Sequence, residues 1–121
     1  MAWDFNNTQA VYLQISERLR RDIVNGKYPP DSQIPPVRQL AFEASVNPNT
    51  MQKALSTLES EGIIYSKGTV GRFVTSDKAI IENAKIMLRV SFVKRILNEA
   101  KAMDMDADEL IGGIKKEENK L

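Results

Sequence analysis

Two short helices joined by a tight turn are predicted by residues 36–61, PVRQLAFEASVNPNTMQKALSTLESE. The first covers about 36–44, and proline suits its first turn because the missing N–H would have no partner inside the helix. The second covers about 48–61, after an Asn47 cap and before a helix-ending Gly62. Apolar residues recur at helical spacing in both: Val37, Leu40, Ala41 and Ala44, then Met51, Ala54, Leu55 and Leu58. So compact a pair predicts a helix-turn-helix.

The flanking segments add a helix before this pair and a hairpin after it. A helix is predicted over residues 9–25, with Thr8 as N-cap and Gly26 at its end; its apolar stripe is Tyr12, Ile15, Leu19 and Ile23. Residues 63–75 change to β-branched and aromatic runs around a glycine-containing turn at 67–71, which predicts a hairpin. Three helices followed by a hairpin is the winged-helix order. We assign it to residues 1–76.

Residues 77–121 predict a helical tail with two apolar stripes on its first, long helix, which covers about 78–103. One stripe is Ile86, Val90, Val93, Leu97 and Ala100, and the other is Ile81, Ala84, Leu88, Phe92, Ile96 and Met103. A last helix, opened by Asp106 with Glu109 as a capping box, can cover only one of them with Leu110, Ile111 and Ile114. The other stripe must then pack on the winged domain or on a second chain. The heptad-like steps of the first stripe favour it as the dimer seam.

Composition excludes several classes of protein. The sequence has no cysteine and no histidine, which removes disulfides, the usual zinc ligands and nucleophile–histidine pairs. Its six glycines form no nucleotide-binding loop. We therefore expect no enzyme, no cofactor and no metal site. No apolar run is long enough for a membrane span and no secretory signal is evident, so a cytoplasmic protein is expected.

Charge alone indicates no partner. The net charge is +1, and residues 1–76 contain eight Lys and Arg against seven Asp and Glu. A strongly basic surface for nucleic acid could therefore arise only if folding gathers the positive side chains on one face.

The polar face of the predicted third helix carries hydrogen-bonding side chains that are not acidic: Asn49, Thr50, Gln52, Lys53, Ser56 and Thr57. Its acidic residues, Glu59 and Glu61, come only at the C-terminal end. Such a face suits insertion into a DNA major groove, where Gln pairs with adenine and Lys meets guanine or phosphate. The start of the helix favours phosphate through its free N–H groups. The alternative is an ordinary solvated face.

Two further places could contact DNA. Arg38 projects from the second helix near its start and could reach a base edge or phosphate, although pairing with a nearby carboxylate is the alternative. In the hairpin, Lys67, Thr69 and Arg72 flank glycines that let backbone approach a sugar-phosphate wall. A plain solvent-facing turn explains the hairpin residues equally well.

Six motifs follow one another along the chain: Tyr12-Leu-Gln-Ile15, Gly26-Lys-Tyr-Pro-Pro30, Ile34-Pro-Pro-Val-Arg-Gln-Leu-Ala41, Val46-Asn-Pro-Asn-Thr50, Ala54-Leu55…Leu58-Glu-Ser-Glu-Gly62 and Gly68-Thr-Val-Gly71-Arg-Phe-Val74. In this order they resemble the GntR family of bacterial transcription regulators. The short tail resembles the YtrA-like subfamily. The resemblance implies that Arg38 contacts bases, that Asn47, Asn49 and Thr50 contact phosphate and bases, that Gln52 and Lys53 read bases, and that Gly68 and Gly71 form the wing tip. Asp31 departs from a usual glycine and Pro36 from a common serine.

The sequence thus predicts a mainly α (α+β) protein, with a winged helix-turn-helix over 1–76 and a two-helix dimerisation tail over 77–121. We expect a homodimeric transcription regulator that binds an inverted-repeat operator in double-stranded DNA and represses by occlusion. Whether a small-molecule effector exists stays open. Two alternatives remain: a winged helix that docks a protein partner, and a fragment of the subfamily that joins this domain to a pyridoxal-phosphate enzyme fold.

Overall fold

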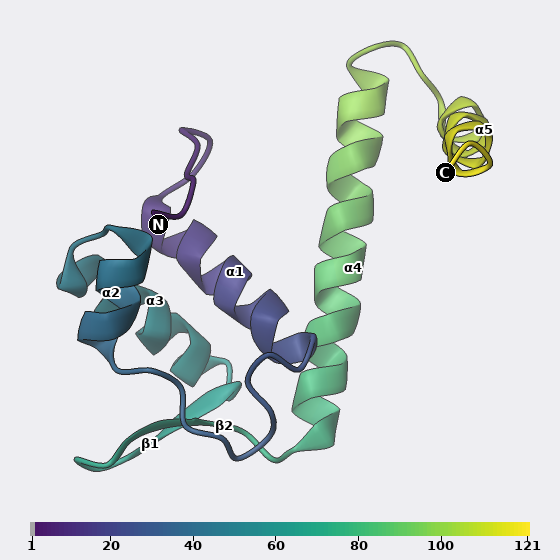
Figure 1. Ribbon diagram of the computed structural model, residues 1–121. Coiled ribbons are helices and arrows are strands. Elements are labelled where there is room, and N and C mark those ends of the chain that lie inside the picture. Colours follow the sequence, from purple (N-terminus) through teal and green to yellow (C-terminus); the bar gives the residue numbers. More distant parts are fainter. Residues whose placement is uncertain (1) are drawn as a thin grey trace. The chain divides into compact units, whose positions relative to one another are not determined.

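The structure is a computed structural model that describes residues 2–121. Its elements follow in the order α1 (Val11–Val24), α2 (Val37–Ala44), α3 (Pro48–Ser60), β1 (Ile64–Lys67), β2 (Gly71–Val74), α4 (Lys78–Lys101) and α5 (Ala107–Glu118). Figure 1 shows these elements along the chain. The chain forms two compact units, of which the first ends at Lys85 and the second begins at Ile86. Three helices and a hairpin succeed one another in the first unit, so the predicted winged-helix order is confirmed.

The core of the first unit lies between α1, α2 and α3. Ile15, Leu40, Met51 and Leu55 are fully buried there, and burying each such side chain stabilises the fold by about 1.5–3 kcal/mol. α3 packs against both α1 and α2, so its opposite face stays outside. Three residues from the start of α4 join the same core: Ile80, Ile81 and Ala84. This compact unit therefore continues past residue 76, where the sequence analysis places the domain boundary.

Four helices end on a left-handed residue. Gly26, Ser45, Gly62 and Asp104 have φ values of 85°, 57°, 78° and 57°. In each case the next amide donates back to a carbonyl five residues earlier, as when Val46 N–H bonds the Ala41 carbonyl at 3.0 Å. The tight turn between α2 and α3 arises this way. Asn47 follows at once and caps α3, because its side chain accepts a hydrogen bond from the Asn49 amide at 2.7 Å.

Two predicted helix starts differ from the structure. Thr8 does not cap α1; the N-cap is Ala10, which has no side-chain hydrogen bond, and the Thr8 hydroxyl donates to the Asn6 side chain instead. Pro36 is the N-cap of α2 rather than part of its first turn, since its ψ of 158° is extended. The helix that carries Arg38 thus begins one residue later than expected.

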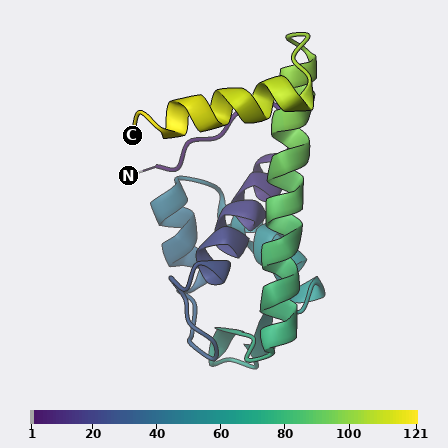
Figure 2. The same cartoon turned by 90° about the vertical axis from the view of Figure 1, so that its right-hand side faces the viewer.

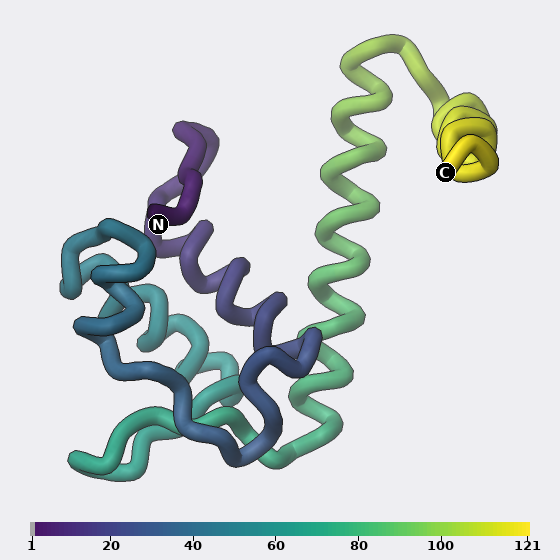
Figure 3. Tube along the Cα trace, viewed as in Figure 1, coloured from purple at the N-terminus to yellow at the C-terminus, as the bar shows by residue number. Residues whose placement is uncertain are grey.

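The wing is an antiparallel hairpin in which Ile64 pairs with Val74 and Lys67 with Gly71. The connector before α2 runs along β2, as the trace in Figure 3 lets the reader follow. Backbone hydrogen bonds join the two: the Ile34 amide bonds the Arg72 carbonyl at 3.0 Å, and the Val74 amide bonds the Ser32 carbonyl at 2.9 Å. The hairpin is therefore anchored to the rest of the domain along the β2 strand.

In the second unit, α5 runs across the axis of α4 instead of along it (Figure 2). The capping box of Asp106 and Glu109 that the sequence predicts is present. α5 buries none of its described side chains, and Ile111 and Ile114 are 49% and 48% exposed. The predicted packing of these residues on α4 is therefore wrong for the single chain. The left-handed turn at Asp104 directs α5 away. None of the described helices is long and apolar enough to cross a membrane.

Candidate nucleic-acid interface

The outward face of α3 is polar along its whole length. Its exposed residues include Asn49, Gln52, Lys53 and Ser56, which three- and four-residue spacing places on one side of the helix. Thr50 is half-buried at the start, and the first turn contains no acidic residue. The face therefore offers donors and acceptors of the kind that pair with base edges, beside a helix N-terminus that favours phosphate.

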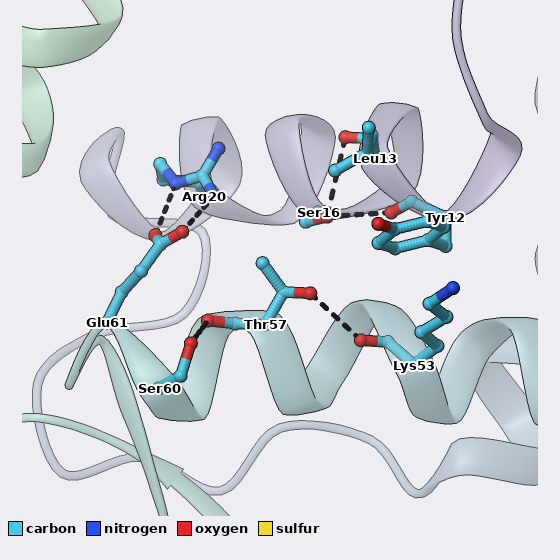
Figure 4. A network of polar contacts seen from close by, with 8 residues as sticks. All are labelled: Tyr12, Leu13, Ser16, Arg20, Lys53, Thr57, Ser60 and Glu61. Carbon is cyan, nitrogen blue, oxygen red and sulfur yellow. Dashed lines mark hydrogen bonds and ion pairs between the residues drawn. The ribbon is translucent and has the colours of Figure 1, made fainter.

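Lys53 has a neighbour that the sequence analysis does not predict. Its ammonium lies 4.1 Å from the centre of the Tyr12 ring, on the facing helix α1. Figure 4 shows the lysine side chain rising from α3 towards that ring. A cation over an aromatic face is held by the ring's negative centre, which restricts the directions that this long side chain can take. Tyr12 thus helps to determine where the charge of Lys53 lies.

Arg38 is exposed on the first turns of α2. Among residues 2–121 it has no carboxylate partner within ion-pairing distance, so the pairing that competed with a DNA contact is not found. Phe42 lies one turn further on and is 86% exposed. The guanidinium of Arg38 is therefore available to a ligand outside the chain.

The tip of the wing is shaped by its glycines. Gly71 has a φ of 137°, and a Cβ there would lie 2.5 Å from Nε2 of Gln33, which donates to the Val70 carbonyl at 2.8 Å. Gly68 has a φ of 50° with nothing within 4 Å of a Cβ, and Thr69 beside it is exposed. The tip is thus open to solvent at residue 68 and closely packed at residue 71.

Side chains of the two strands stiffen the hairpin. Tyr65 and Phe73 are cross-strand partners whose rings stack with centres 5.8 Å apart, and the Lys67 ammonium lies 5.1 Å from the Phe73 ring centre. Tyr65 donates a hydrogen bond to Asp31 at 3.2 Å. Desolvation, and then this bond, raise the pKa of Tyr65 above its ordinary value, so its hydroxyl stays a donor. Lys67 thus lies at the exposed end of a hairpin whose strands are joined by these contacts.

Both acidic residues at the end of α3 are held by arginines. Glu61 accepts two hydrogen bonds from Arg20 of α1, at 2.9 and 2.8 Å (Figure 4). Glu59 accepts a hydrogen bond from Nε of Arg72 of β2. The two carboxylates are therefore neutralised by arginines, whereas no ion pair is found within residues 2–121 for Arg38 on α2, Lys53 on α3 or Lys67 on the wing.

The predicted dimer stripe is only partly open in the single chain. Ile86, Val90 and Val93 are 49%, 42% and 49% exposed, and Leu97 is half-buried. Ala100 is buried, with 2% of its surface exposed, and its carbonyl accepts a hydrogen bond from the Met105 amide at 3.0 Å. From the other stripe, Phe92 is 53% exposed. Large apolar side chains thus remain uncovered on α4.

Comparison with known proteins settles the family. Residues 11–74 match the bacterial regulatory proteins of the gntR family, which is more than half of the chain. The chain belongs to the GntR family. It is 32% identical to the transcriptional repressor YtrA of Bacillus subtilis over 104 residues, covering 86% of this chain and 75% of YtrA. It is 28% identical to the uncharacterised regulator YhcF of the same species, covering 92% of both.

Solved structures of GntR-family regulators agree. A GntR-family transcriptional regulator from Listeria monocytogenes superposes with a TM-score of 0.82 at 29% identity, covering 93% of this chain and 98% of that one. The DNA-binding domain of AraR, solved with the operator ORX1, superposes with a TM-score of 0.53 at 32% identity, covering 59% of this chain and 92% of that one. These relatives are transcription regulators and not enzymes. This GntR protein is therefore a DNA-binding regulator by family, similar to YtrA in sequence.

Proposed function

We propose that this GntR protein binds operator DNA sequence-specifically, with α3 in the major groove. The observation that carries the proposal is the exposed face of α3, whose polar side chains face outward while both nearby carboxylates are held by arginines. Side chains that pair well with one base discriminate against the wrong one by about 1–3 kcal/mol each. The AraR domain that resembles this chain was solved on an operator, which supports the same use of the fold here.

The contacts are divided among three elements. Gln52 and Lys53 read base edges from α3, and Arg38 contacts a base or phosphate from α2. The start of α3 contacts the DNA backbone through the side chains of Asn47, Asn49 and Thr50, where the positive end of the helix dipole favours phosphate. At the wing, Lys67, Gly68, Thr69 and Gly71 approach the adjacent sugar-phosphate wall.

The binding species is a homodimer formed through the tail. Burying the exposed half of Ile86, Val90 and Val93 in two copies is worth about 5–9 kcal/mol. Association costs of about 4 kcal/mol or more offset much of this, and the exposed Ile111 and Ile114 of α5 offer further apolar surface. A two-fold dimer presents two copies of α3, so the operator is an inverted repeat.

Repression by occlusion is the regulatory outcome that we propose. YtrA is described as a transcriptional repressor, and a protein bound across an operator blocks access to the DNA beneath it. A regulator of a bacterial chromosome acts in the cytoplasm, where we place this one. We assign no small-molecule effector to it.

The salt dependence of a DNA complex tests this proposal against a protein-docking role. The full chain should bind duplex DNA with an affinity that falls steeply with salt, because each phosphate contact releases a counterion and adds about −0.9 to the slope of log K against log salt. Arg38→Ala should weaken this binding. Arg21→Ala removes the same charge from the exposed surface of α1 and is the control, which should bind DNA as the wild type does. A chain that binds no duplex at low salt would refute the proposal and favour the protein-docking role.

A further inference from the structure

Glu59 joins the recognition helix to both strands of the wing. Its Oε1 atom accepts a hydrogen bond from the Ser66 hydroxyl of β1 at 3.1 Å. The same atom accepts a hydrogen bond from Nε of Arg72 of β2. Ser66 and Arg72 are direct partners across the hairpin. One carboxylate oxygen on α3 therefore holds both strands at a single rung of the ladder.

The pair is partly withdrawn from water. The Arg72 side chain is 18% exposed and that of Glu59 is 31% exposed, so solvent and salt screen the two charges less than on an open surface. Glu59 also lies in the last turn of α3, where the negative end of the helix dipole disfavours a carboxylate and makes a cation partner more valuable. Arg72 supplies that cation. Most of the Arg72 side chain is covered by the protein, and its Nε–H already donates to Glu59.

We propose that Arg72 is a positioning residue, which with Glu59 and Ser66 fixes the wing against the recognition helix and does not itself contact DNA. The inference rests on the proposed binding of DNA by α3 and the wing. It assigns a role in operator affinity to Glu59, a residue whose negative charge would otherwise be expected only to repel DNA. Lys67 and the tip glycines then reach the DNA backbone only while this anchor is in place.

Glu59→Gln separates this proposal from direct contact, because the two predict opposite signs. Removing a negative charge favours DNA binding in general, and if Arg72 contacted DNA the variant would also free it, so affinity would rise and the salt slope would steepen. A positioning role predicts the reverse: operator affinity falls about 3–10-fold, despite the more positive protein, and the salt slope does not steepen. Glu61→Gln is the matched control, with the same change in charge two residues away and its partner Arg20 on α1.

A second measurement needs no DNA. In the full chain, amide hydrogen exchange in the hairpin should quicken in Glu59→Gln and in Arg72→Gln and stay unchanged in Glu61→Gln, since locally weakened structure opens more often. The double variant should bind operator no more weakly than the weaker single variant, as expected for residues that act as one unit. Tighter binding by Glu59→Gln, or unchanged hairpin exchange, would overturn the proposal. Failure of the wild-type chain to bind any duplex would instead refute the proposed function. The exchange experiment, which needs no DNA, would then still test whether Glu59 and Arg72 hold the hairpin.

Discussion

Gly71→Ala should destabilise the protein more than the same change three residues earlier. An alanine Cβ at residue 71 would lie 2.5 Å from Nε2 of Gln33, closer than atoms can approach, so the glutamine must move. Its hydrogen bond to the Val70 carbonyl, 2.8 Å long, is then lost. In addition, the φ of 137° at this position is one that L-residues rarely adopt.

The expected loss follows from these two effects. Holding a non-glycine residue in a sparsely populated backbone region costs about 1–3 kcal/mol. The lost hydrogen bond adds about 0.5–1.5 kcal/mol. Gly71→Ala should therefore lower the free energy of unfolding by about 2–4 kcal/mol. At Gly68, where φ is 50° and a Cβ meets open space, the left-handed backbone alone costs about 1–2 kcal/mol.

Urea denaturation of the full chain gives both values. A second pair of variants isolates the clash: in a Gln33→Ala background the Gly71→Ala change should cost only the backbone strain, leaving a coupling of about 1 kcal/mol between the two positions. Equal losses at residues 68 and 71, with no coupling to Gln33, would show that the tip is not packed as described.

Three other changes test the interface and the dimer. Arg38→Ala should weaken operator binding by about 1–3 kcal/mol while leaving a scrambled duplex less affected; an equal loss on both would make Arg38 a phosphate contact. Tyr12→Leu removes the ring under Lys53 and should lower operator affinity several-fold in the wild type. In a Lys53→Ala background the same change should lower it less than twofold, and equal losses in both backgrounds would show that the two residues act independently. Ile86→Glu with Val93→Glu should make the protein sediment as a monomer, whereas Phe92→Glu on the other stripe should leave it dimeric; the opposite pattern would move the seam to the Phe92 side.

The elements could be predicted from sequence because their causes are local. Helical spacing on α3, the Asn47 cap and the glycines at 26 and 62 each act within a few residues, and the structure has them as predicted. The direction of α5 was missed because the turn that determines it depends on Asp104, which carries no marker as plain as a glycine. A local sequence pattern therefore does not predict that the chain turns away from α4 at this residue.

The contacts that refine the candidate site join residues far apart in the chain. Arg20 and Glu61 are 41 positions apart, and the Lys53 and Tyr12 contact has the same separation. The sequence around each residue carries no signal for its partner, because the two residues of each pair meet only when α1 packs on α3. The same reason explains Arg72: its sequence position at the wing predicts a DNA contact, and its contact with Glu59 appears only once β2 lies beside α3.

Selection from random DNA duplexes by the full-length protein, followed by sequencing of the bound fraction, tests sequence-specific operator binding most directly. The account predicts enrichment of an inverted repeat with two equivalent half-sites, about one helical turn or a multiple of it apart, because two copies of α3 are related by a two-fold axis. Recovery of duplexes with no shared sequence would contradict specific binding, and enrichment of a single unrepeated site would contradict the dimer.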